Sequence, residues 1–199
     1  MPLQCQKLVI NLVRKVLGAA IEEYPKTPSW LMRPGAAECG EHWSLICHIY
    51  KELTGRQLPI QMPKRERRSV DGILKGGDSQ PRIIEVDESQ HFNKFRAQTL
   101  SHYPLELELA FDRETWLQHC QCEPKYKSGG WATPKPPLFP EPGGRHLQRA
   151  FRDALTDILP PDYGFLPTLR IAKFEIEDWI HAADAPAKMK ALLDRKLQI

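Results

Sequence analysis

One stretch, Arg82-Ile-Ile-Glu-Val-Asp-Glu-Ser-Gln-His-Phe92, constrains the fold of this chain more than any other. Its first residues are branched and apolar, which predicts a buried strand. Three acids and a histidine lie in the same stretch, although a purely structural strand has little use for them. On a strand, Glu85 and Asp87 point to one face while Val86 points to the other. Two like charges on one face repel each other unless a cation lies between them, so this stretch is the first place to look for a metal.

A hairpin brings a further acid toward this pair. A short strand is predicted over residues 69–74, a turn over 75–79, and the returning strand over 82–87. Asp71 lies inside the first strand, where an ionised acid is unfavourable unless it is solvated, hydrogen-bonded or bound to a cation. We therefore expect the carboxylates of this acid and of the Glu85–Asp87 pair to converge.

The chemistry of such a cluster is that of a hard cation. Carboxylate oxygens suit Mg²⁺ or Mn²⁺, and a site poor in thiolates does not suit zinc. Magnesium held by carboxylates is a common arrangement for phosphodiester hydrolysis. His91, at the start of the next predicted helix, is placed to act as a general acid or base near the metal.

A structural explanation of the same residues stays open. Asp71 can be a turn residue before Gly72, the Glu85–Asp87 pair can bind nearby arginines, and His91 can begin a helix without a chemical task. The combination of three acids and a histidine around one hairpin favours a site.

Apolar periodicity and proline or glycine boundaries predict the remaining elements. Helices are expected over residues 3–23, 37–54, 92–103, 112–121, 145–159, 176–181 and 186–197, and a third strand over 166–172. Residues 105–109 alternate as a half-buried strand or a helix start does. Residues 123–144 hold two glycine pairs and six prolines, which predicts a surface excursion or a loop over the site.

Composition limits the class of protein. The 199 residues are 41% apolar, enough for one core, and no run of eighteen apolar residues predicts a membrane span. The N-terminus lacks a signal-peptide core, so a cytoplasmic location is expected. Five irregularly spaced cysteines argue against a disulfide framework. The net charge of +3 is too small to indicate by itself that the protein binds nucleic acid. Basic residues cluster at 64–68 and at Arg145, Arg149 and Arg152, and each cluster alone is typical of a solvated face.

A resemblance to a known family adds to this pattern. Asp71-Gly72, followed about a dozen residues later by Ile-Glu-Val-Asp-x-x-Gln-His, resembles the core of the PD-(D/E)XK nuclease superfamily. Within it, the motif is similar to the branch that includes the very-short-patch mismatch-repair endonuclease and its small relatives. The likeness covers about residues 69–103 and 145–182. Asp87 stands where the superfamily has a lysine, and Glu88 where the branch has a glycine; Lys94 or Arg149 are candidates for the missing cation.

The resemblance implies an α/β (α+β-like) fold. It consists of a restriction-endonuclease-like core with a small mixed sheet flanked by helices, plus a helical N-terminal extension. Residues 1–65 form the helical portion and 66–199 the nuclease-like core, with the excursion at 123–144, and the two parts are expected to make one compact unit.

The implied function is an Mg²⁺- or Mn²⁺-dependent endonuclease that hydrolyses phosphodiester bonds of DNA, duplex DNA above all. The metal ligands would be Asp71, Glu85 and Asp87, and His91 would assist proton transfer. The phosphate contacts would come from Arg67, Arg68, Lys94, Arg145 and Arg149. Two alternatives remain: an inactive module of the same fold that binds nucleic acid or a protein partner, and a structural protein in which the acids only form ion pairs.

Overall fold

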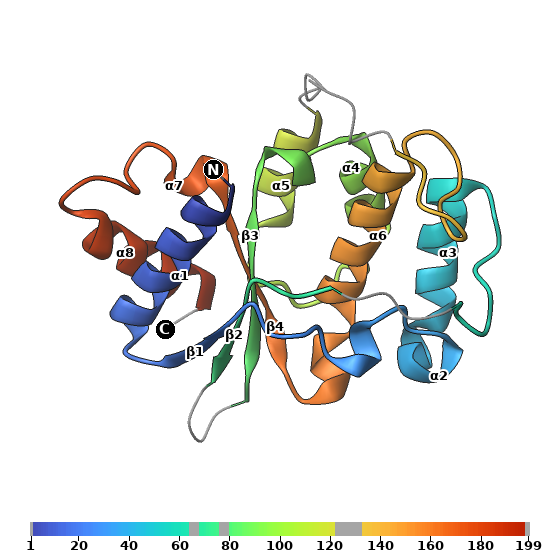
Figure 1. The fold of residues 1–199 in the computed structure, drawn as a ribbon, viewed down its shortest axis with the longest axis horizontal. Helices are drawn as coiled ribbons and strands as arrows, with labels where there is room; N and C mark the ends of the chain where they lie inside the picture. Colours follow the sequence, from blue (N-terminus) through green and yellow to red (C-terminus); the bar gives the residue numbers. More distant parts are fainter. Residues whose placement is uncertain (1, 64–67, 76–79, 122–132, 198–199) are drawn as a thin grey trace.

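A small mixed sheet covered by helices on both faces forms the centre of the molecule (Figure 1). The computed structural model describes residues 2–63, 68–75, 80–121 and 133–197. Within these residues the sheet has four strands in the order β1-β2-β3-β4. The α/β class with a mixed sheet flanked by helices and an N-terminal helix is thereby confirmed.

The strands are β1 (Ala20–Glu23), β2 (Gly72–Lys75), β3 (Arg82–Asp87) and β4 (Leu166–Ala172). The pairs β1–β2 and β2–β3 are antiparallel, whereas β4 runs parallel to β3 and places Arg170 opposite Glu85. The predicted hairpin and the bounds of β3 and β4 are confirmed. The strand predicted over 69–74 begins only at Gly72, because residues 68–71 run beside another segment: Tyr24 N donates to Asp71 O at 3.1 Å.

One face of the sheet carries three helices: α1 (Pro2–Leu17), the short α7 (Lys173–Ile176) and α8 (Ala185–Leu197). Val9 and Ile10 of α1 and Leu193 of α8 pack in one buried cluster with Ile84 and Val86 of β3. The face of β3 that carries Ile84 and Val86 is therefore used for packing, and only the opposite face is available for polar chemistry.

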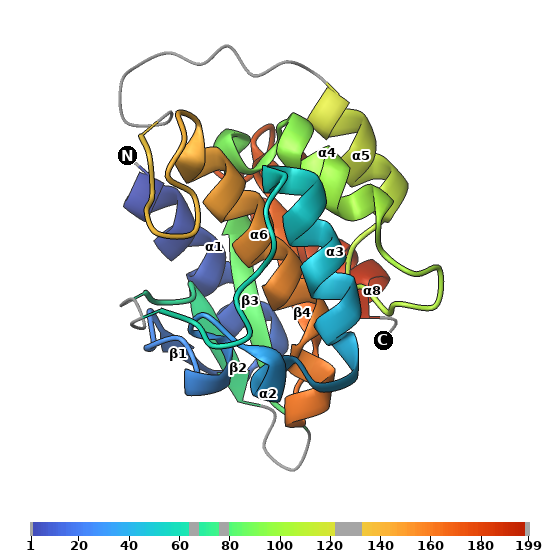
Figure 2. The same cartoon turned by 90° about the vertical axis from the view of Figure 1, so that its right-hand side faces the viewer.

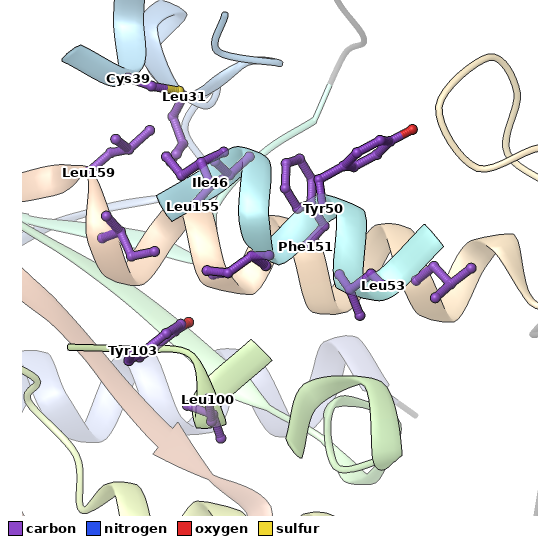
Figure 3. Close-up of a cluster of buried hydrophobic side chains, with 14 of the residues drawn as sticks. Leu31, Cys39, Ile46, Tyr50, Leu53, Leu100, Tyr103, Phe151, Leu155 and Leu159 are labelled. Atoms are coloured by element: carbon purple, nitrogen blue, oxygen red, sulfur yellow. The ribbon is translucent and has the colours of Figure 1, made fainter. Parts of the chain in front are cut away.

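The opposite face carries α3 (Trp43–Thr54), α4 (Lys94–Ser101), α5 (Arg113–Gln121) and α6 (Gly144–Ile158). Figure 2 shows α3 and α6 side by side. Tyr50 and Phe151 meet between them with ring centroids 5.4 Å apart, in the apolar cluster of Figure 3. This cluster fixes α6 against the sheet, which matters because α6 forms one wall of the site described below.

Short elements complete the fold: α2 (Ala36–Cys39) and the 3₁₀ turns η1 (Ser29–Leu31), η2 (Gly40–His42), η3 (Ser89–His91) and η4 (Pro160–Tyr163). The helix predicted over 37–54 is divided into α2, η2 and α3, since Gly40 has a φ of +50°. Gly55 ends α3 in the left-handed region, with a φ of +68°.

Two helix predictions were wrong at their bounds. The helix predicted over 3–23 ends at Leu17, where Gly18 turns the chain with a φ of +61° and residues 20–23 pair with β2 instead. The helix predicted over 176–181 lies earlier, as α7, because the Glu175 carboxylate accepts the backbone N–H of Ala172 and begins the helix there. The N-terminal portion therefore contains the edge strand β1 as well as helices.

The other helix predictions are confirmed to within two residues. Asn93 caps α4 by accepting the backbone N–H groups of Phe95 and Arg96. Residues 105–109 form neither a strand nor a helix. Residues 133–143 also contain no regular element, as predicted, while 122–132 lie outside the described residues. None of the described helices is long and apolar enough to cross a bilayer.

Candidate functional site

A polar pocket of about 140 Å³ lies between α6, the polar face of β3 and the residues that precede β2. Charged groups dominate its lining. The arginines are Arg68, Arg145, Arg149 and Arg152, the acids are Glu85 and Asp153, and His91 completes the set. The pocket therefore joins residues from four separate parts of the chain.

The wall formed by α6 follows from helical spacing. Arg145, Arg149, Arg152 and Thr156 advance by four, three and four residues, which predicts one shared face. All four line the pocket. The opposite stripe of α6, with Leu147, Phe151 and Leu155, is buried. The amphipathic pattern of this helix thus directs the arginines to the pocket and the apolar stripe to the core.

Glu85 lines this pocket, and its carboxyl group interacts with that of Asp71, which does not belong to the lining. Asp71 Oδ2 accepts the backbone N–H of Val86 at 2.8 Å, so its carboxyl group reaches across the hairpin. Burial raises the pKa of Asp71 to about 6, although that hydrogen bond opposes the shift. Burial and the charge of Asp71 raise the pKa of Glu85 well above its ordinary value. Two acids that resist ionising together are an arrangement that a cation would relieve.

Asp87 has a different environment, although it shares a strand face with Glu85. It is only 1% exposed, and its two oxygens lie 2.8 and 3.1 Å from Arg170 Nη1. Trp116 Nε1 donates to its Oδ2 at 3.3 Å. Asp87 does not line the pocket. Of the three predicted ligands, the structure thus brings only Glu85 to the pocket lining, with Asp71 close enough to interact with it, and it places Asp87 in a buried ion pair.

His91 lies at the end of η3 and lines the pocket. Its Nδ1 is 2.9 Å from Asp153 Oδ2 and 3.5 Å from Asp87 Oδ1. Burial alone would lower the pKa of His91, but the charges of Asp153 and Asp87 outweigh it and the pKa is raised. Burial likewise opposes ionisation of Asp153, but His91 and Arg170 hold its pKa well below the usual range. His91 and Asp153 therefore form a charge-assisted pair.

Asp153 and Arg170 are site residues that the sequence reasoning missed. A signal for each was present: Asp153 shares the helix face of Arg149 and Thr156, and Arg170 is the one charged residue of the buried strand β4. A charged residue inside a buried strand requires a partner, and that requirement points to the acids on β3 and α6.

The predicted phosphate contacts are only partly brought together. Arg68, Arg145 and Arg149 line the pocket, and Arg68 is held by its Nη2 donating to Thr156 Oγ1 at 3.0 Å. Lys94 is exposed, with its ammonium 5.3 Å from the centre of the Phe95 ring, and does not line the pocket. Arg67 lies outside the described residues. Of the two candidates for the missing cation, only Arg149 belongs to the site.

The donor geometry limits how a metal would bind. Among the described residues, only Glu41, His42 and Asp162 bring three possible ligand atoms within 4.8 Å of one another. The expected set of Asp71, Glu85 and Asp87 does not meet this spacing. The carboxyl pair of Asp71 and Glu85, with its raised pKa values, is the part of that set that fits a hard cation.

The fold and the pocket define a class: an α/β protein with one mixed sheet and an acid–histidine–arginine pocket against its polar face. Residues 48–182 match a family of unknown function, DUF7255, and the chain belongs to this family. No curated protein and no solved structure shows significant similarity to the chain.

Proposed function

We propose that this protein hydrolyses phosphodiester bonds of nucleic acid with the help of Mg²⁺ or Mn²⁺, and that duplex DNA is its substrate. The observation that carries the proposal is the carboxyl group of Glu85, which lines a pocket together with four arginines and interacts with the carboxyl group of Asp71. The motif resemblance over residues 69–103 and 145–182 supports the same reading, since one of its acids, Glu85, and its histidine, His91, line this pocket.

Asp71 and Glu85 would hold the cation. Both carboxyl groups have raised pKa values, and a cation beside them would favour their ionised forms. When bound, such an ion polarises a phosphoryl oxygen and makes a bound water more acidic. Asp87 would act indirectly, since Arg170 already neutralises its carboxylate.

The remaining pocket residues would bind the phosphate and transfer the proton. Arg145 and Arg149 supply donors suited to phosphate oxygens, without preference for base sequence. Because its pKa is raised, His91 keeps its proton to a higher pH than an ordinary histidine, and it would donate a proton to the leaving oxygen.

The test is cleavage of supercoiled plasmid with Mg²⁺ or Mn²⁺. We expect Asp71→Asn and Glu85→Gln to lower the nicking rate at least about 100-fold, as loss of positioned catalytic groups does. Glu177→Gln is the matched control, because Glu177 is an exposed acid on the other side of the sheet that pairs with Lys173 at 3.3 Å. Equal nicking rates for all three variants would contradict the assignment of Asp71 and Glu85 to the site.

A second candidate is a module that binds nucleic acid or a protein without cutting. It is favoured by one specific observation: Asp87, in the place of the motif lysine, is held by Arg170 and Trp116, and Lys94 does not line the pocket. Salt-dependent binding of duplex DNA, with no cleavage by wild type in either metal, would select this candidate.

A further inference from the structure

Behind His91 lies a network of buried charges centred on Arg170. This side chain is 0% exposed. Its Nη1 donates to Asp87 Oδ1 at 2.8 Å, and its Nη2 donates to the backbone oxygen of Asp153 at 3.2 Å. Its Nε donates to Asp157 Oδ1 at 2.6 Å. One guanidinium group therefore binds three acidic residues from two different elements, β3 and α6.

Arg96 forms the end of the network that does not contact His91. Its Nη2 donates to Asp157 Oδ2 at 2.6 Å, and its Nη1 donates to the Tyr103 hydroxyl at 2.8 Å. The network thus combines two arginines with three aspartates, which leaves one net negative charge. Asp87 and Asp153 lie at the end that meets His91, so their negative charges favour the protonated imidazole.

The geometry distinguishes the two nitrogens of His91. Both carboxylates approach Nδ1, at 2.9 Å for Asp153 and 3.5 Å for Asp87. No described residue hydrogen-bonds Nε2, while the ring itself lines the pocket. In a histidine, the hydrogen bond made by one ring nitrogen decides which nitrogen carries the proton in the neutral form.

We propose that Arg170 is the positioning residue of this site: it holds Asp87 and Asp153 against Nδ1 of His91, keeps a proton on Nδ1, and leaves Nε2 to exchange protons at the pocket. The catalytic meaning of this inference rests on the proposed function. The geometric claim does not, because the state of the imidazole can be measured without any substrate. Arg170 itself does not line the pocket, so it acts only through the two carboxylates.

The experiment measures the ring-nitrogen chemical shifts of His91 by NMR, at a pH where the imidazole is neutral, with His91→Gln used to assign the signal. We expect wild type to be protonated on Nδ1. Arg170→Lys should lower the Nδ1–H population at least about threefold, because a lysine has no planar fork to hold both carboxylates. Arg96→Lys is the matched control: Arg96 is equally buried and also binds Asp157, but it has no bond to Asp87 or Asp153.

A second variant keeps the test decisive if Arg170→Lys does not fold. Asp153→Asn removes the closer carboxylate with little change in shape, and it should also shift the proton toward Nε2. A wild-type imidazole protonated on Nε2, identical shifts in Arg170→Lys and Arg96→Lys, or an unchanged tautomer in Asp153→Asn would each overturn the inference. Absence of nicking with the expected Nδ1–H form would reject the proposed function and leave the positioning role supported.

Discussion

At the scale of single residues, the buried carboxyl groups of Asp71 and Glu85 are unfavourable for the stability of the metal-free protein when they ionise. The pKa of Asp71 is about 6 in the folded chain, above its ordinary value of 3.8. The folded state therefore binds the proton more tightly than the unfolded state, and stability falls as the pH rises from about 4 to about 6.

The pH dependence that Asp71 causes leads to a prediction about stability. At pH 7.5 without divalent metal, Asp71→Asn should stabilise the protein by about 1 to 3 kcal/mol, because the buried charge is removed and each pKa unit corresponds to about 1.4 kcal/mol. Thermal unfolding with and without Mg²⁺ measures this. Wild type should gain stability from Mg²⁺ and Asp71→Asn should not; a variant that is less stable and still responds to Mg²⁺ contradicts the account.

His91 gives the same direction of pH dependence as Asp71, although here the charged form is the one that the folded state favours. Its pKa is raised in the folded state, so the stabilisation from its protonated form is complete below the unfolded value of 6.5 and is lost as the pH rises through the folded value. As a proton donor, it should make the cleavage rate fall over the same window. We expect His91→Gln to lower the rate by about 10² to 10⁴ and to remove this alkaline fall in the pH–rate profile. An unchanged profile in the variant would assign the proton transfer to another group.

At the scale of elements, α6 should determine the affinity for nucleic acid. Arg145→Ala and Arg149→Ala should each weaken duplex binding and reduce the salt slope by about one, because each removes one phosphate contact. Lys188→Ala is the matched control for loss of a positive charge, because Lys188 is an exposed residue of α8 that pairs with Asp184 at 3.1 Å. Filter or fluorescence binding at several salt concentrations measures the slope; equal slopes for all three variants would exclude α6 from the interface.

The elements also show what sequence patterns can and cannot predict. Apolar spacing predicts β3, β4 and the buried stripe of α6, because burial imposes a period of 2.0 or 3.6 on the residues themselves. It does not predict β1, since residues 20–23 become a strand only through pairing with β2. Glu85 and Asp87 share a strand face as expected, yet their environments differ because Arg170, which is far from both in sequence, hydrogen-bonds Asp87 and not Glu85. Such partners depend on tertiary structure, which periodicity does not encode.

At the scale of the whole molecule, Gly72 marks where the N-terminal elements meet the hairpin. A β-carbon at this position would lie 3.2 Å from Ile10 Cδ1 and 3.2 Å from Ile21 Cγ2, so α1 and β1 both pack against it. We expect Gly72→Val to lower the free energy of unfolding by about 1 to 3 kcal/mol through overpacking. Urea unfolding followed by far-UV circular dichroism and by tryptophan fluorescence measures this, and we expect both signals to change in one shared transition.

The central claim is that Asp71 and Glu85 bind a divalent cation that cleaves nucleic acid in the arginine-lined pocket. Its most direct test is the initial rate of cleavage of a labelled DNA duplex, titrated with Mn²⁺, for wild type, Glu85→Gln and Glu177→Gln. We predict saturable Mn²⁺-dependent cleavage by wild type and Glu177→Gln, with a rate at least about 100-fold lower for Glu85→Gln. Cleavage by Glu85→Gln at the wild-type rate, or no cleavage by wild type at any Mn²⁺ concentration, would contradict the claim.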